Sequence, residues 1–165
     1  MMDYRPIKPA SGPHPNAHLA RDSNLIEKAL EFQLVGQIMA RLLLRGHRSE
    51  VLHSVCDRDG YDIVIEAKGI VRHIQLKAIV QGGKRANVSL PVGLGRKRSG
   101  CAVVMGWDQN VIQPVGFHFF GGLPGQPLPD LGAKITNHTR GKKKPRSEHG
   151  NIGLGKFIRQ ADSIC

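Results

Sequence analysis

The stretch GYDIVIEAKGIVRHIQLKAIV at residues 60–80 decides the fold, because it has the pattern of a β-hairpin. Two runs rich in β-branched residues, DIVIE and VRHIQLKA, flank the turn-forming pair Lys68 and Gly69. A two-residue loop at that pair matches positions whose numbers sum to 137, so Asp62 faces Gln75. The sequence therefore predicts an antiparallel hairpin with a defined register.

The two faces of this hairpin differ in chemistry. Opposed residues on antiparallel strands share a face, so Asp62 lies beside Gln75, and Lys77 projects from the same side. The sequence thus predicts an acid, an amide and an amine together, although a merely solvated face has the same pattern. The other face is apolar and is expected to pack into a core: Ile63, Ile65, Ile74 and Leu76.

A long helix precedes the hairpin. The segment LIEKALEFQLVGQIMARLLLRG follows an N-cap at Ser23 or Asn24 and ends at Gly46, which is suited to a left-handed C-cap. Apolar residues spaced by three and four predict which side is buried. The predicted buried residues are Leu34, Val35, Ile38, Met39 and Leu42, and those expected on the solvated side are Gln33, Gln37 and Arg41.

Glu31 falls on the predicted buried stripe, because Val35, Ile38 and Leu42 follow it at i+4, i+7 and i+11. A lone carboxylate in a core costs several kcal/mol unless it is paired or binds a ligand. Glu31 is therefore expected near an open edge of the core or beside a cation. Glu27 lies one turn earlier, where the helix dipole also favours an acid.

The remaining segments differ in their content of regular structure. A strand is expected at 50–56, and two further strands at 101–107 and 111–120 are expected to extend the sheet. Residues 1–23 hold four prolines and are expected to form a flexible arm. Residues 121–150 are basic and rich in Gly and Pro, with no periodicity.

Length and charge restrict the class of protein. A chain of 165 residues predicts a single domain over 24–165, after the arm. Lys and Arg outnumber Asp and Glu by 24 to 13, and a net charge of +11 favours nucleic acid or an anionic membrane as partner. No apolar stretch approaches the ~20 residues of a membrane span, and the first residues lack a signal-peptide core. We therefore expect a cytoplasmic protein without a membrane partner.

Together, these features resemble the PD-(D/E)XK nuclease superfamily. The resemblance covers about residues 24–80: an acid on a long helix, G-x-D before three apolar residues at 60–65, and IQLK at 74–77. It implies a restriction-endonuclease-like α/β fold, with a mixed β-sheet packed against the long N-terminal helix. Two positions depart from the family pattern, since Tyr61 replaces a proline and Gln75 replaces an acid.

The resemblance also implies the roles of the site residues. Asp62 would bind the metal, Gln75 and Lys77 would stand for the Glu and Lys of the E-x-K element, and the helix would complete the site. A hard cation takes oxygen ligands, so Mg²⁺, with Mn²⁺ as its substitute, is the expected cofactor. The implied catalytic residues are Asp62, Gln75, Lys77 and Glu31; the implied metal ligands are Asp62, Gln75, the Leu76 backbone carbonyl and Glu31, with Glu27 as its alternate.

Two basic clusters are expected to contact the phosphates of double-stranded DNA. One is Arg96, Lys97 and Arg98, and the other is Arg140, Lys142, Lys143, Lys144 and Arg146. Lys84 and Arg85, which follow the second hairpin strand, are less distinctive. Members of the superfamily often act as dimers, so a homodimer is compatible with the resemblance, but no interface is evident in the sequence.

The sequence therefore favours a metal-dependent nuclease that hydrolyses phosphodiester bonds in DNA. The main alternative is a non-catalytic DNA- or RNA-binding module on the same fold, in which Gln75 marks a weakened metal site. A third interpretation is a basic protein bound to ribosomes or another RNA assembly.

Overall fold

The predicted hairpin forms the centre of the fold. Strand β2 (Ile63–Ala67) pairs antiparallel with β3 (Ile70–Val80), and the numbers of their paired residues sum to 137. Lys68 and Gly69 both have positive φ, at 56° and 72°, as a two-residue type I′ turn requires. The predicted turn and register are confirmed.

The computed structural model describes residues 19, 21–56, 59–131, 135–137 and 145–157, and of 135–137 and 145–148 only the backbone. Within it, a five-stranded sheet has the order β1-β2-β3-β5-β6. Strands β3 and β5 are parallel and the other neighbours are antiparallel, so the sheet is mixed. Its remaining strands are β1 (Ser49–His53), β5 (Gly100–Asp108) and β6 (Gln113–Gly121).

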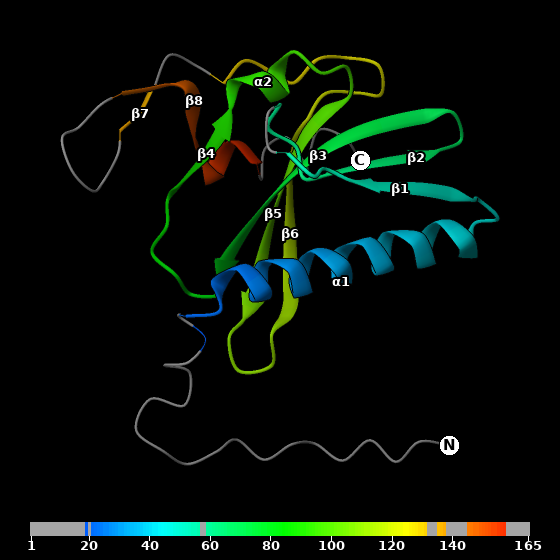
Figure 1. The fold of residues 1–165 in the computed structure, drawn as a ribbon, viewed down its shortest axis with the longest axis horizontal. Coiled ribbons are helices and arrows are strands. Elements are labelled where there is room, and N and C mark those ends of the chain that lie inside the picture. Colours follow the sequence, from blue (N-terminus) through cyan, green and yellow to red (C-terminus); the bar gives the residue numbers. More distant parts are fainter. Residues whose placement is uncertain (1–18, 20, 57–58, 132–134, 138–144, 158–165) are drawn as a thin grey trace.

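Helix α1 (Ser23–Leu44) lies along one side of this sheet (Figure 1). It ends as predicted, with Gly46 at φ 75°. Its N-cap is Asp22 and not Ser23 or Asn24, because the Asp22 carbonyl already accepts the Ile26 N–H at 3.0 Å. The fold class is therefore the predicted one, a mixed α/β fold with a long N-terminal helix.

The first core lies between α1 and the sheet. Leu30 and Leu34 of α1 pack with the apolar face of the hairpin. The predicted burial of Met39 is wrong, since 36% of this side chain is exposed. Gln33 was expected in solvent but is half-buried, and its Nε2 donates to the Ile112 carbonyl at 2.8 Å.

A second, three-stranded sheet covers part of the opposite side of the main sheet (Figure 1). The sequence predicted no regular structure in most of these segments. They become strands by pairing with one another, which local propensity does not encode. Their order is β4-β8-β7, and the elements are β4 (Asn87–Pro91), the short helix α2 (Val92–Gly95), β7 (Ile135–Asn137) and β8 (Pro145–Gly153).

The second core joins the two sheets. Ala102 and Val104 of β5 pack against β4 and β8, while Cys101 and Val103 face the α1 side. Strand β5 is thus buried on both faces, as the central strand of a layered α/β fold should be. Among the described residues, no helix is both long enough and apolar enough to cross a membrane.

Candidate functional site

The site forms where the two hairpin strands part. Strand β2 begins at Ile63, but β3 continues beyond that point, so the β3 edge needs another partner. The Asp62 carboxylate provides it, because Oδ2 accepts the Leu76 N–H at 2.6 Å. The same oxygen accepts Gln75 Nε2 at 2.6 Å. The predicted pairing of Asp62 with Gln75 is therefore present as a hydrogen bond.

A close contact at Gly60 fixes the position of the segment that precedes Asp62. Gly60 has φ 74°, and a Cβ at this position would lie 2.3 Å from Pro91 Cβ. Only glycine meets both conditions. Gly60 therefore allows the segment before β2 to pass against β4 and to deliver Asp62 to the β3 edge.

Gln75 is the most deeply buried polar residue of the site, with 2% of its surface exposed. Its Nε2 lies between Asp62 Oδ2 and the Leu76 carbonyl, at 2.6 and 3.2 Å. Its Oε1 is buried and, within the described part of the chain, has no hydrogen-bond partner. Leaving such an acceptor unmet costs about 1–3 kcal/mol, so an orphaned amide oxygen requires an explanation.

Glu31 is buried on α1, with 5% of its surface exposed. Its two carboxylate oxygens lie 3.0 and 2.9 Å from Lys28 Nζ, and Oε1 also lies 2.8 Å from His53 Nδ1. The expected cationic partner is therefore Lys28, three residues earlier on the same helix. His53, at the end of β1, was not predicted to contact Glu31.

One pocket of about 470 Å³ gathers the predicted catalytic residues. All four of them line it, as do Glu27, the alternative helix acid, and the hairpin residue Leu76. Arg85, which is less distinctive in the sequence than the later basic clusters, also lines this pocket. The four residues that meet here are Glu31, Asp62, Gln75 and Lys77.

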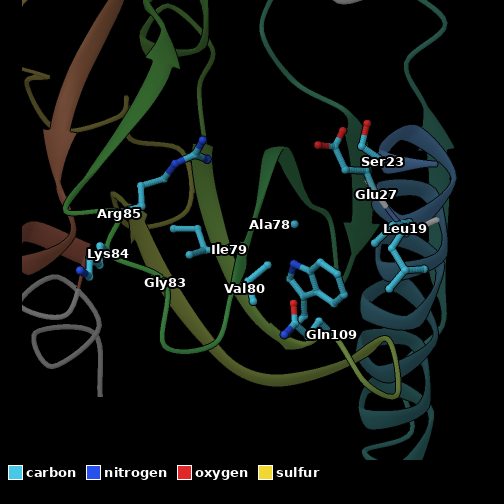
Figure 2. Close-up of a pocket in the computed structure, with 12 residues that line it drawn as sticks. Leu19, Ser23, Glu27, Ala78, Ile79, Val80, Gly83, Lys84, Arg85 and Gln109 are labelled. Carbon is cyan, nitrogen blue, oxygen red and sulfur yellow. The ribbon is translucent and has the colours of Figure 1, made fainter. Parts of the chain in front are cut away.

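A second pocket of about 510 Å³ adjoins the first and shares Glu27, Ala78 and Arg85 with it. Figure 2 shows Glu27 on the α1 side and Arg85 on the opposite side, where the chain leaves β3. Lys84 lies beside Arg85 in this lining. Arg85 therefore borders both pockets, and Lys84 borders the second one.

The predicted phosphate-binding clusters lie apart from this pocket or outside the described chain. Lys97 Nζ pairs with Asp59 at 2.7 Å and lies 5.4 Å from the centre of the Tyr61 ring, so part of its charge is already compensated. Arg96 and Arg98 are exposed, and neither lines the pocket. Arg140, Lys142, Lys143 and Lys144 lie outside the described residues, and of Arg146 only the backbone, in β8, is described.

The donor set suits a hard cation with few protein ligands. Mg²⁺ commonly takes one or two carboxylates and completes its shell with water and phosphate oxygens. Asp62 supplies a carboxylate, and Gln75 Oε1 and the Leu76 carbonyl supply neutral oxygens. Among the described residues, no three His, Cys, Asp or Glu side chains are grouped as a metal site. This donor set would suit Mg²⁺, which needs few protein ligands.

Comparison with known proteins shows a likeness to a solved structure. A scan against protein-family models and a search of curated proteins both found no match. Among solved structures, the bacterial homing endonuclease I-Ssp6803I is similar at 20% identity and a TM-score of 0.31. The match covers 81% of this chain and 94% of that one.

Proposed function

We propose that the protein is a divalent-metal-dependent nuclease of the PD-(D/E)XK type that hydrolyses DNA. The observation that supports this most is the meeting of Asp62, Gln75 and Lys77 with a buried helix acid around one pocket. An acid, an amide oxygen and an amine at the point where two strands part can hold a cation and a phosphate together. If this hairpin face were simply exposed to solvent, Gln75 would not be buried and its Oε1 would bind water.

The orphaned oxygen has a use in this proposal. Gln75 Nε2 donates to Asp62, and its Oε1 has no partner among the described residues. A half-turn of the amide exchanges the two atoms and places Oε1 beside the Asp62 carboxylate. Asp62 and Gln75 Oε1 would then be the residues that hold the cation. When bound there, a divalent ion supplies Lewis-acid polarisation of the scissile phosphate.

The other side chains position the substrate. Hydrolysis forms a bond between a water oxygen and phosphorus and breaks the bond to the leaving oxygen, which takes up a proton. Lys77 can orient the attacking water or neutralise charge that develops on the phosphate. Arg85 lines the same pocket and Lys84 lines the adjoining one, and both can bind neighbouring phosphates.

Cleavage of plasmid and oligonucleotide DNA in Mg²⁺ or Mn²⁺, compared with EDTA, tests the proposal. Asp62→Asn and Lys77→Met should each reduce the cleavage rate by at least 100-fold, on the order of the contribution of one charge-stabilising group. Lys68→Asn at the hairpin turn removes an equal charge far from the pocket and should leave cleavage unchanged. Cutting that persists in EDTA or in Asp62→Asn would exclude the proposed centre.

Thermal unfolding gives a readout that does not depend on catalysis. Mn²⁺ should raise the Tm of the wild-type protein and have no such effect on Asp62→Asn, because a ligand that binds only the folded state stabilises it. Gln75→Glu should have a lower Tm in EDTA, since a second buried carboxylate repels Asp62. It should gain more than the wild type from Mn²⁺. An equal Mn²⁺ response in all three proteins would argue against a cation at this site.

One observation favours a second candidate, a non-catalytic DNA-binding module. Lys28 and His53 already contact the Glu31 carboxylate, and Gln75 supplies no charge. Among the described residues that line the pocket, Asp62 and Glu27 are then the acids left for a cation. A binding module should retain DNA affinity in Asp62→Asn and should not cut DNA under any metal condition. Salt-sensitive binding without cleavage would therefore select this candidate.

A further inference from the structure

Helix α1 has a second apolar face, which is largely exposed; among the described contacts, its Phe32 ring lies 5.5 Å from the His53 ring of β1. Besides the residues packed on the sheet, six apolar or small residues are spaced alternately by four and three along the helix. All six are exposed, and the four large side chains have 36–70% of their surface exposed. The six, here called the outer stripe, are Leu25, Ala29, Phe32, Gly36, Met39 and Leu43.

The charges of α1 avoid the outer stripe. A surface helix normally presents its charged residues to solvent and its apolar residues to the core. The four charged residues of α1 all fall outside the stripe, and Glu31 is buried on the opposite side. Figure 1 shows α1 on the outside of the main sheet, with no labelled element over its outer side. An uncharged face of this length is typical of an interface.

The sizes of the side chains identify a second copy of the chain as the partner. An antiparallel two-fold centred at position 34 exchanges residues whose numbers sum to 68. It sets Phe32 against Gly36 of the other copy and Met39 against Ala29. Leu25 then meets Leu43 at both ends. In two of these three pairs a large side chain thus faces a small one. All six stripe residues are exchanged among themselves, as an isologous interface requires.

The spacing fits this geometry as well. Steps of four and three average to the 3.5-residue repeat of a coiled-coil seam, in which one helix packs its side chains between those of its partner. A helix of 22 residues is about 33 Å long, and a third of its surface is roughly 400–500 Å². Two copies together bury close to 1,000 Å², about the lower bound for a specific interface.

We infer that the protein forms an antiparallel homodimer through the outer stripe of α1. The dimer is weak, with a dissociation constant in the micromolar range. Its interface is small, and the two copies, each with a net charge of +11, repel each other. Added salt screens this repulsion and tightens the dimer, whereas it weakens binding to DNA. The inference does not depend on nuclease activity.

Sedimentation of the full-length chain over a range of concentrations tests the dimer. The wild type should shift from monomer to dimer, and Phe32→Glu and Gly36→Glu should stay monomeric. Gly36 has open space around an added Cβ, so Gly36→Glu should keep or raise the Tm of the monomer. Gln37→Glu, which is exposed but off the stripe, should dimerise as the wild type does.

Cross-linking tests the register separately, with Cys56 and Cys165 replaced by serine. A mixture of Phe32→Cys and Gly36→Cys chains should form a disulfide-linked dimer on oxidation, and each chain alone should form far less. Equal cross-linking by either chain alone would overturn the antiparallel register. A wild-type protein that stays monomeric at every concentration, or a dimer that survives Gly36→Glu, would overturn the interface.

Discussion

At the scale of single residues, Asp62 has two tasks that compete for one carboxylate. Its Oδ2 accepts two hydrogen bonds, from Gln75 and from the Leu76 N–H, and so closes the edge of β3. In the proposed nuclease the same carboxylate also binds a cation. A loss of activity on substitution therefore needs a stability measurement beside it.

Asp62→Ala should lower the free energy of unfolding by about 1–3 kcal/mol, because the Leu76 N–H loses its acceptor. Asp62→Asn keeps an oxygen at this position and should lose less. Urea unfolding measures both. Asp108→Ala is a matched control, since Asp108 accepts the Asn110 N–H at 2.7 Å but at an exposed turn. Equal losses at both aspartates would show that Asp62 has no special structural role.

Cys101 connects stability to pH. Burial raises the pKa of its thiol to about 12, although the nearby Arg72 lowers it slightly. Below about pH 8.5 the thiol is protonated in both states, so its burial carries no penalty from ionisation. Above that pH the unfolded chain ionises while the folded protein does not, and stability falls up to about pH 12.

The wild type should therefore lose stability relative to Cys101→Ala by up to about 1.4 kcal/mol per pH unit above pH 8.5. Urea unfolding of both proteins between neutral pH and about pH 11 measures the difference. If the stability of both proteins depends on pH in the same way across this range, the raised pKa of Cys101 is contradicted. The comparison cancels the other groups that titrate there, since both proteins share them.

At the scale of elements, Glu31 links α1 to β1. The Glu31 carboxylate contacts Lys28 of the same helix and His53 of the strand. The buried acid therefore has polar partners on both elements. His53→Ala should loosen this link and lower the free energy of unfolding. Glu31→Gln in the same chain should recover part of the loss, because it removes the buried charge that His53 accompanies.

A double-mutant cycle of Glu31→Gln and His53→Ala measures this link by urea unfolding. We expect a coupling energy of about 1 kcal/mol, because the His53 side chain is partly exposed. Glu66, an exposed acid on β2, gives the control cycle with His53→Ala, and its coupling should be close to zero. Additive effects of Glu31 and His53 would show that the contact contributes nothing.

The elements also show what the sequence can and cannot predict. The hairpin register was predictable because its turn and its alternation of apolar and polar residues are local. The contact of Lys28 with Glu31 is local as well, since the two lie within one helical turn. The contact of His53 with Glu31 was not predictable, because it joins residues that are 22 positions apart. Strand β8 was missed for the same reason, since its polar sequence becomes a strand only by pairing with β4. Helix α1 has two apolar faces; the local pattern indicated the one that meets the sheet, but assigned Met39 of the exposed face to it.

At the scale of the whole molecule, charge and shape separate two surfaces of α1. Glu27 faces the pockets that Arg85 and Lys84 border, while the outer stripe on the far side has no charge. DNA and a second copy of the chain would thus use different faces. Both can bind at once, so dimer-breaking variants should keep their affinity for a short oligonucleotide.

The salt dependence of DNA binding shows which cations contact phosphates. Each contact contributes about −0.9 to the slope of log K against log salt for duplex DNA. Arg85→Ala should reduce the slope by about this amount, because Arg85 lines the pocket that holds Asp62. Neutralising Lys142, Lys143 and Lys144 together should reduce it by up to about 2.7. Fluorescence anisotropy of a labelled duplex at several KCl concentrations measures these slopes, with Lys68→Asn as the control of equal charge. If Arg85→Ala and Lys68→Asn give the same slope as the wild type, DNA does not enter by this pocket, and the proposed centre loses its substrate.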